Sequence, residues 1–217
     1  MNEGAAPAAR APRERDGFQR ALLLEAPHPL PADFPARLDE ALAGGRIAGV
    51  IVDPRGVEHP GRAAFLADLV ARCHRFAAAL FLAEDAAAVI EAGADGALLR
   101  AAEGIEGARR LLGLERPIGV TIGRSRHAAM EAGEAGADWL LLGEGEPFPY
   151  RLRLVRWWSE LFVLPCAARC ASPEEGAALL QAGVDFLIPP LAVWDDPERA
   201  LAPYRDLLDS PRATAAG

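Results

Sequence analysis

A short sequence phrase, Ala-Gly-Ala-Asp or Ala-Gly-Val-Asp followed by an apolar run, recurs three times. It constrains the fold of this chain more than any other feature. Its glycine suits the left-handed position that ends many helices, and the apolar run after it has the length of a strand buried on both faces of a parallel sheet. The copies are separated by 43 and 47 residues, about the length of two strand–helix units. The phrase therefore marks every second unit of a repeating α/β fold. It reads Glu91-Ala-Gly93-Ala-Asp95, Glu134-Ala-Gly136-Ala-Asp138 and Gln181-Ala-Gly183-Val-Asp185.

Short apolar runs alternate with stretches rich in Ala, Leu, Glu and Arg along the rest of the chain. We predict strands at residues 21–25, 47–52, 78–82, 96–99, 118–122, 139–142, 161–166 and 186–188. We predict a helix after each strand, at residues 33–43, 61–76, 84–92, 104–112, 125–135, 150–159, 172–182 and 196–208. Eight strand–helix units joined by short loops predict a (β/α)8 TIM barrel, a member of the α/β class.

The alternative α/β architecture is a doubly wound open sheet. A Gly-x-Gly-x-x-Gly sequence does not follow the first predicted strand, which weakens that alternative. The 217 residues lie near the lower end for a barrel, and no linker divides them, so we predict one domain over residues 18–209. The flanking residues 1–17 and 210–217 are expected to be disordered tails.

Composition excludes several classes of function. The net charge of −8 and the pI of about 5.1 argue against binding to nucleic acid or to an anionic membrane, which a basic face would favour. The apolar runs are far shorter than the ~20 residues of a membrane span. Residues 1–17 lack the apolar core of a signal peptide, so we expect a cytoplasmic protein.

The cysteines suit a reducing compartment. Cys73, Cys166 and Cys170 are too few for a disulfide framework. Cys166-x3-Cys170 has no second Cys or His pair at matching spacing, which disfavours zinc and leaves the role of the pair open.

Lysine is absent, and all 23 cationic side chains are arginine. This excludes Schiff-base chemistry, lysine general bases and P-loop lysines. His28, His59, His74 and His127 do not cluster in the sequence, and we assign none of them a catalytic role.

In a barrel of this kind, function lies in the loops that follow the strands. Glu84 and Glu103 follow the third and fourth predicted strands. Carboxylates on adjacent strands favour Mg²⁺, which prefers oxygen ligands and bridges to phosphates. Solvated surface charge is the simpler interpretation of each residue taken alone.

Arginines on the same rim are candidates for phosphate binding. Arg100, Arg124 and Arg169 follow the fourth, fifth and seventh predicted strands. Ser172 lies where barrels often bind phosphate at a helix N-terminus, although a simple helix cap explains it as well. Pro189-Pro190 removes N–H donors after the eighth strand, so this phosphate site looks impaired.

Residues 81–100, 118–143 and 163–196 resemble the thiamine-phosphate synthase family and its thiazole tautomerase-like branch. The resemblance rests on the three copies of the repeated phrase, on Ile118-Gly-Val-Thr121 and on Asp195-Asp-Pro near the end of the chain. The family joins an aminopyrimidine diphosphate to a thiazole phosphate, and Mg²⁺ holds the leaving diphosphate. The resemblance therefore implies a barrel in thiamine biosynthesis that takes a small phosphorylated substrate and Mg²⁺.

Some family positions keep related residues. The family's Asn-Asp after the third strand falls on Ala83-Glu84, and its Gly-Gln-x-Asp after the fourth strand leaves Glu103 as the carboxylate. Its serine after the fifth strand falls on Thr121. The Gln-x-Arg-x-Lys motif after the second strand is not recognisable, and Arg55 is the arginine nearest to its place. The resemblance thus implies metal ligands at Glu84 and Glu103 and catalytic roles for Thr121 and Arg55.

Other family positions are lost. The Thr-x-Thr-Lys loop after the sixth strand is replaced by residues 146–150, and the serine after the eighth strand falls near Leu191. The Gly-Gly phosphate turn falls on Arg169. Arg169 and Arg100 are then either a remodelled anion site or two surface arginines, and we slightly favour the second.

Two hypotheses on function follow. The first is a divergent thiamine-phosphate synthase-like enzyme, a Mg²⁺-dependent transferase that handles a phosphorylated pyrimidine or thiazole intermediate. The second is a catalytically degenerate paralogue that binds a ligand or a partner protein, and the lost phosphate residues favour it. A homo-oligomer is compatible with either.

Overall fold

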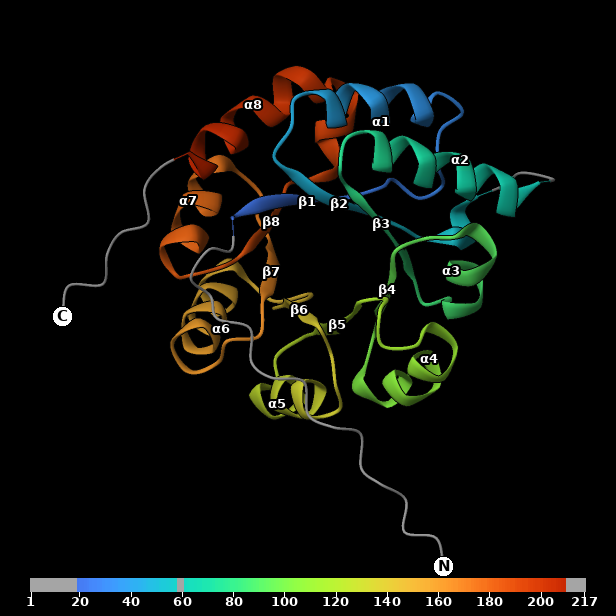
Figure 1. Cartoon of the computed structure of the whole chain (residues 1–217). Coiled ribbons are helices and arrows are strands. Elements are labelled where there is room, and N and C mark those ends of the chain that lie inside the picture. Colours follow the sequence, from blue (N-terminus) through green and yellow to red (C-terminus); the bar gives the residue numbers. More distant parts are fainter. Residues whose placement is uncertain (1–18, 58–60, 210–217) are drawn as a thin grey trace, which may run out of the picture.

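The computed structural model describes residues 19–57 and 61–209, and its strands close into a barrel. Eight parallel strands pair in chain order, and β8 pairs with β1 to complete the ring, with the helices outside it (Figure 1). The predicted (β/α)8 barrel is confirmed, and the open sheet is wrong. The two predicted tails, 1–17 and 210–217, lie outside the described residues.

The elements alternate regularly. The strands are β1 Ala21–Glu25, β2 Ile47–Val52, β3 Ala79–Ala83, β4 Gly96–Leu99, β5 Ile118–Ile122, β6 Trp139–Leu142, β7 Cys166–Arg169 and β8 Phe186–Ile188. The helices are α1 Phe34–Ala43, α2 Arg62–Arg75, α3 Ala86–Ala92, α4 Ile105–Leu112, α5 Arg126–Glu134, α6 Phe148–Leu161, α7 Pro173–Gln181 and α8 Pro197–Leu208. Three 3₁₀ turns are η1 Pro54–Gly56, η2 Ala102–Gly104 and η3 Leu191–Asp195. Within the described ranges, we find no helix with the length and apolar character that crossing a membrane requires.

The seventh strand lies later in the chain than the sequence predicts. Residues 161–166 are wrong for it, because α6 continues to Leu161 and β7 begins at Cys166. Trp158 is buried, and the ring of Phe162 stacks on it with 4.1 Å between ring centres. The Trp158 indole N–H donates to the Leu164 carbonyl at 2.9 Å. The apolar residues after α6 therefore pack against the helix end. As a consequence, Arg169 is the last residue of a strand.

The repeated phrase fastens neighbouring strands at their amino ends. Its glycines all have positive φ, between 68 and 96°. Its aspartate carboxylate accepts a hydrogen bond from a backbone N–H of the preceding strand, which satisfies a donor that would otherwise be buried. The pairs are Asp95 with Leu80 at 2.7 Å, Asp138 with Ile118 at 2.9 Å and Asp185 with Cys166 at 2.9 Å.

Two large rings, Phe81 and Trp139, pack among aliphatic side chains inside the barrel. Phe81 and Trp139 meet edge to face with 5.5 Å between ring centres. Strand glycines make room for them, because a Cβ at Gly49 or Gly96 would lie 3.0 Å from the Phe81 ring and one at Gly119 only 2.3 Å from Trp139. The interior is thus a packed core, as in other barrels, and a cavity lies at the end of the barrel.

Candidate active site

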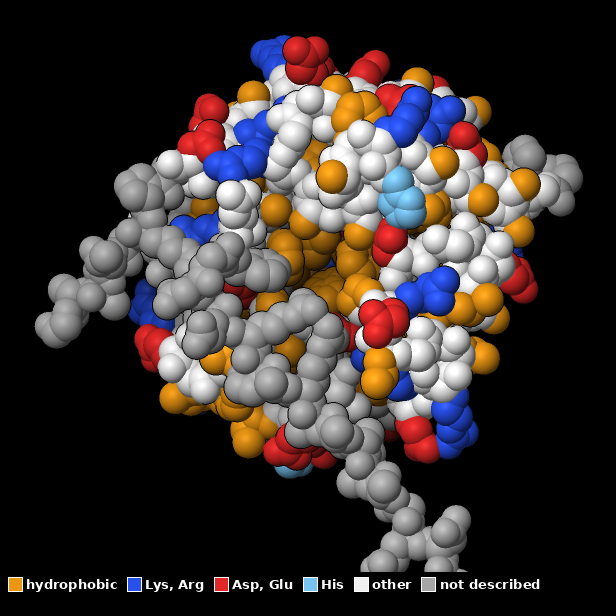
Figure 2. Space-filling model, viewed as in Figure 1, with side chains coloured by type: hydrophobic (Ala, Val, Ile, Leu, Met, Phe, Trp, Pro, Cys, Tyr) orange, Lys and Arg blue, Asp and Glu red, His pale blue; other side chains and the backbone are white. Residues whose placement is uncertain are grey.

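The cavity opens at the carboxyl ends of the strands and has a volume of about 640 Å³. The face in Figure 2 is hollowed at its centre, where hydrophobic side chains form the visible floor. Ile51 and Leu98 line the cavity from inside the barrel. Its charged lining consists of four carboxylates and three guanidinium groups, from Glu25, Asp53, Glu84, Glu144, Arg55, Arg100 and Arg169.

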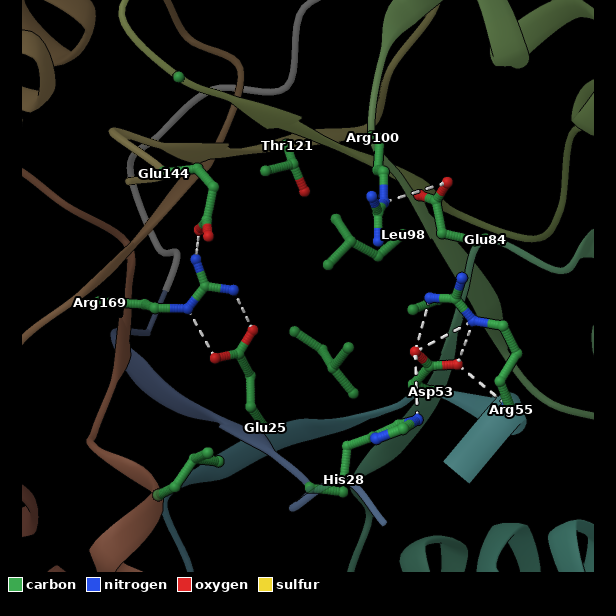
Figure 3. Close-up of a pocket in the computed structure, with 15 residues that line it drawn as sticks. Glu25, His28, Asp53, Arg55, Glu84, Leu98, Arg100, Thr121, Glu144 and Arg169 are labelled. Atoms are coloured by element: carbon green, nitrogen blue, oxygen red, sulfur yellow. Dashed lines mark hydrogen bonds and ion pairs between the residues drawn. The ribbon is translucent and has the colours of Figure 1, made fainter. Parts of the chain in front are cut away.

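Arg169 lies between two carboxylates on one side of the cavity (Figure 3). Its Nε donates to Glu25 Oε2 at 2.6 Å and its Nη2 to Glu25 Oε1, so the pair is bidentate, while its Nη1 forms an ion pair with Glu144. Glu25 ends β1, and its backbone carbonyl accepts a hydrogen bond from the Trp194 indole at 2.6 Å. Arg169 therefore lines the cavity, which favours the remodelled anion site over a surface arginine.

Asp53 and Arg55 form a second charged group after β2. The Asp53 carboxylate accepts hydrogen bonds from the Arg55 backbone N–H at 2.9 Å and from Nη2 at 2.7 Å. The side-chain hydrogen bond from Arg55 lowers the pKa of Asp53 below its ordinary value of 3.8. His28 Nε2 lies 4.0 Å from Asp53. Its ring packs on η1 where Gly56 carries no side chain, since a Cβ there would lie 2.7 Å from the imidazole.

Glu84 and Arg100 form the third group, from the ends of β3 and β4. Glu84 Oε2 lies 3.6 Å from Arg100 Nε, and the two side chains are 30% and 73% exposed. Glu84 has a φ of 62°, a left-handed conformation that costs a non-glycine residue ~1–2 kcal/mol. Such strain gathers at functional sites, which favours a role for Glu84. Thr121 on β5 points into the cavity between Arg100 and Glu144 (Figure 3).

The structure brings together only some of the predicted site residues. Arg124 pairs with Glu146 at 2.9 Å on the outer rim. Ser172 accepts the Glu175 backbone N–H at 3.4 Å as the cap of α7. Glu103 is an exposed residue of η2. The predicted residues that line the cavity are Arg55, Glu84, Arg100, Thr121 and Arg169, and those that do not are Glu103, Arg124 and Ser172.

Four titratable residues of the cavity carried no role in the sequence interpretation: Glu25, His28, Asp53 and Glu144. The positions of Glu25, Asp53 and Glu144 hold a signal, because each lies at or within two residues of the end of a predicted strand. His28 lies three residues beyond its strand, and no sequence pattern distinguishes it from the other histidines.

All three cysteines are buried. Burial raises the pKa of Cys73 and of Cys170 to about 12, and Cys166 is fully buried. A thiol of this pKa stays protonated at neutral pH, so it is neither a nucleophile nor a ready metal ligand.

The acidic side chains of the cavity are better suited to a metal that substrate phosphates also bind than to a metal bound by protein ligands alone. In the part of the chain that the structure describes, no group of three or more His, Cys, Asp or Glu residues is placed to hold a metal ion. Single carboxylates at strand ends are compatible with Mg²⁺, which is often bound by one or two carboxylates together with substrate phosphates.

Fold and cavity together define a (β/α)8 barrel protein with a charged site at the carboxyl ends of its strands, where such barrels bind small molecules. Comparison with known proteins narrows this class. Residues 23–188 match the family model described as thiamine monophosphate synthase, and the chain belongs to this family.

Individual relatives agree with the family match. The chain is 37% identical over 194 residues to the thiamine-phosphate synthase of Erythrobacter litoralis, covering 82% of this chain and 90% of that protein. It is 30% identical over 198 residues to the thiamine-phosphate synthase of Hyphomonas neptunium, covering 82% and 87%. The solved thiamine phosphate pyrophosphorylase from Pyrococcus furiosus superposes with a TM-score of 0.74 at 24% identity, covering 88% of this chain and 96% of that one. At this identity, the superposition supports the fold alone.

Proposed function

We propose that this chain is a divergent thiamine-phosphate synthase. It transfers an aminopyrimidinylmethyl group from its diphosphate to the ring nitrogen of a thiazole phosphate. The observation that carries the proposal is the convergence of three arginines and four carboxylates in one cavity of a chain from this family. A cavity of about 640 Å³ is within the range that encloses small ligands.

The chemistry sets what the cavity must supply. When the C–O bond to the diphosphate breaks, negative charge develops on the leaving group, and the pyrimidine cation is trapped by the thiazole nitrogen. Fixed cationic groups aimed at that charge lower the barrier, and little proton transfer is needed. We assign this role to Arg55 and Arg100, because they lie at the same side of the cavity. Thr121 offers a hydroxyl to orient the pyrimidine.

Glu84 is the carboxylate that we propose for Mg²⁺. Its ion pair with Arg100 spans 3.6 Å, whereas Asp53 is held by several hydrogen bonds from Arg55. Glu84 is thus free to bind a metal that shares its remaining ligands with the diphosphate. When bound, Mg²⁺ supplies positive charge next to the departing group. Glu103 lies outside the cavity and is left out of this proposal.

The test is product formation by the purified chain with aminopyrimidine diphosphate, thiazole phosphate and Mg²⁺, followed as the fluorescent oxidation product of thiamine phosphate. We expect product well above a control without enzyme. Glu84→Ala should lower the rate at least about tenfold, in line with the loss of a group that acts on transition-state charge, and the matched change Glu103→Ala should leave it unchanged. Absence of product, with no ligand raising the Tm, would support the degenerate paralogue. Homo-oligomerisation and a cytoplasmic location stay predictions.

A further inference from the structure

Two backbone donors near the place where barrels commonly bind phosphate are engaged within this chain. That site usually lies after strands 7 and 8, at a helix N-terminus. Here the Ala171 N–H donates to Glu175 Oε2 at 2.8 Å, and the Glu175 N–H donates to Ser172 Oγ at 3.4 Å. Pro189 and Pro190 have no N–H to offer. These groups are therefore not open to a phosphate, which favours a side chain on this side of the cavity as its partner.

Arg169 is the cavity arginine on this side, and it is held firmly. Its backbone carbonyl accepts a hydrogen bond from Arg151 Nη1 at 2.7 Å. The Nε and Nη2 edge of its guanidinium is occupied by Glu25, whose side chain is only 19% exposed. The remaining nitrogen, Nη1, faces Glu144. Arg169 thus presents one edge toward the cavity, at a fixed place.

Glu144 is less firmly held than Glu25. It lies between Gly143 and Gly145, which both have positive φ (76° and 70°), in the loop that joins β6 to α6. Its side chain is 44% exposed. Guanidinium groups bind phosphate bidentately and strongly. The carboxylate of Glu144 therefore occupies a position that an incoming phosphate is well suited to take.

We propose that Arg169 and Glu25 form the subsite for the phosphate of the thiazole substrate, and that Glu144 is the resident carboxylate that this phosphate displaces. The proposal rests on the proposed function, since it names the part of that substrate which Arg169 recognises. Glu25 remains in place and orients the guanidinium. Glu144 opposes binding, because every ligand that reaches Arg169 must first break the Glu144 ion pair. An uncharged thiazole alcohol gains nothing from that exchange, so Glu144 also discriminates against it.

Equilibrium binding tests this arrangement without turnover. Calorimetry would measure the Kd of the thiazole phosphate, and of the corresponding alcohol, for the full chain without the aminopyrimidine diphosphate. Glu144→Gln should tighten binding of the phosphate by about fivefold, the value of one exposed ion pair, and leave the alcohol unaffected. Glu146→Gln is the matched control, because Glu146 lies in the same loop and pairs with Arg124 outside the cavity. Arg169→Gln should weaken the phosphate at least about tenfold, as expected for a hydrogen-bonded charge pair.

The proposal is overturned if Glu144→Gln weakens or fails to change phosphate binding, or if it acts no more strongly than Glu146→Gln. It is also overturned if Arg169→Gln keeps full affinity, or if neither the wild type nor Glu144→Gln binds the phosphate. Product formation is assayed separately. If the chain shows these binding effects but makes no product, the subsite is supported and the proposed function is refuted. If it makes product but lacks the binding effects, the proposed function is supported and the subsite is refuted.

Discussion

Substitution of Asp138 tests whether the repeated phrase serves the fold. The Asp138 carboxylate accepts hydrogen bonds from the Ile118 N–H at 2.9 Å and from Arg109 Nη2 at 2.8 Å. Ile118 is fully buried at the start of β5. Asp138→Ala removes the acceptor and leaves that N–H without it, whereas Asp138→Asn keeps an oxygen in the same place and removes only the charge.

The expected costs follow from these contacts. An unsatisfied buried N–H costs ~1–3 kcal/mol, and loss of the part-buried ion pair with Arg109 adds about 1 kcal/mol, the upper value for a pair still in contact with solvent. Arg109 keeps its bonds to the carbonyls of Gly113 and Gly136, so it is not left alone. We therefore expect Asp138→Ala to cost ~2–4 kcal/mol and Asp138→Asn about 1 kcal/mol. For a chain of this size each kcal/mol lowers the Tm by about 2–4 °C.

Urea and thermal unfolding of both variants would measure these costs, and the rate per folded molecule would serve as the control. That rate should stay at the wild-type value, because Asp138 lies at the amino ends of the strands, opposite the cavity. If the two variants lose equal stability, or if Asp138→Ala loses less than about 0.5 kcal/mol, as typical surface substitutions do, the explanation of the repeat is refuted.

Three further predictions concern the barrel interior and the cavity. Gly119→Ala places a Cβ 2.3 Å from Trp139 and should cost ~1–3 kcal/mol in urea unfolding, as overpacked cores do; an unchanged midpoint would contradict the packed interior. Glu84→Gly should raise the unfolding free energy by about 1 kcal/mol by relieving the positive φ while product formation falls, and a loss of stability would argue against strain. Asp53 has a lowered pKa, so its ionised form stabilises the fold above the unfolded pKa, and this contribution is lost as pH falls below about 4 toward the folded pKa. The difference in unfolding free energy between wild type and Asp53→Asn should therefore decrease as the pH is lowered. A difference independent of pH would contradict stabilisation by the ion pair of Asp53 with Arg55.

Most of the fold could be predicted because a barrel repeats one local pattern. Each unit carries its own helix stop, strand and turn, and these depend on near neighbours in the chain. The seventh strand was misplaced for a tertiary reason: the residues after α6 are as apolar as a strand but pack on Trp158 and Phe162. Local hydrophobicity does not distinguish these two uses.

The site was harder to predict because its contacts join distant parts of the chain. Arg169 and Glu25 are 144 residues apart and meet only because β8 closes onto β1. The expectation that functional residues follow the carboxyl ends of the strands finds the candidates, because it depends on topology alone. Which arginine meets which carboxylate depends on the register of the closed barrel. That register left Arg124 and Ser172 outside the cavity, although both follow strands as this expectation requires.

The two ends of the barrel carry separate tasks, and this has a consequence for how substitutions combine. The aspartates of the repeat satisfy backbone groups at the amino ends, whereas the charges of the cavity gather at the carboxyl ends. Substitutions at the amino ends, such as those of Asp138, should therefore change stability without changing activity, and their effects should add to those of cavity substitutions with which they share no partner. Glu84 differs from the other cavity residues in that one residue holds both a strained backbone and the carboxylate that we propose for Mg²⁺. A conflict between stability and activity at Glu84, absent at Asp138, is what this division of tasks requires.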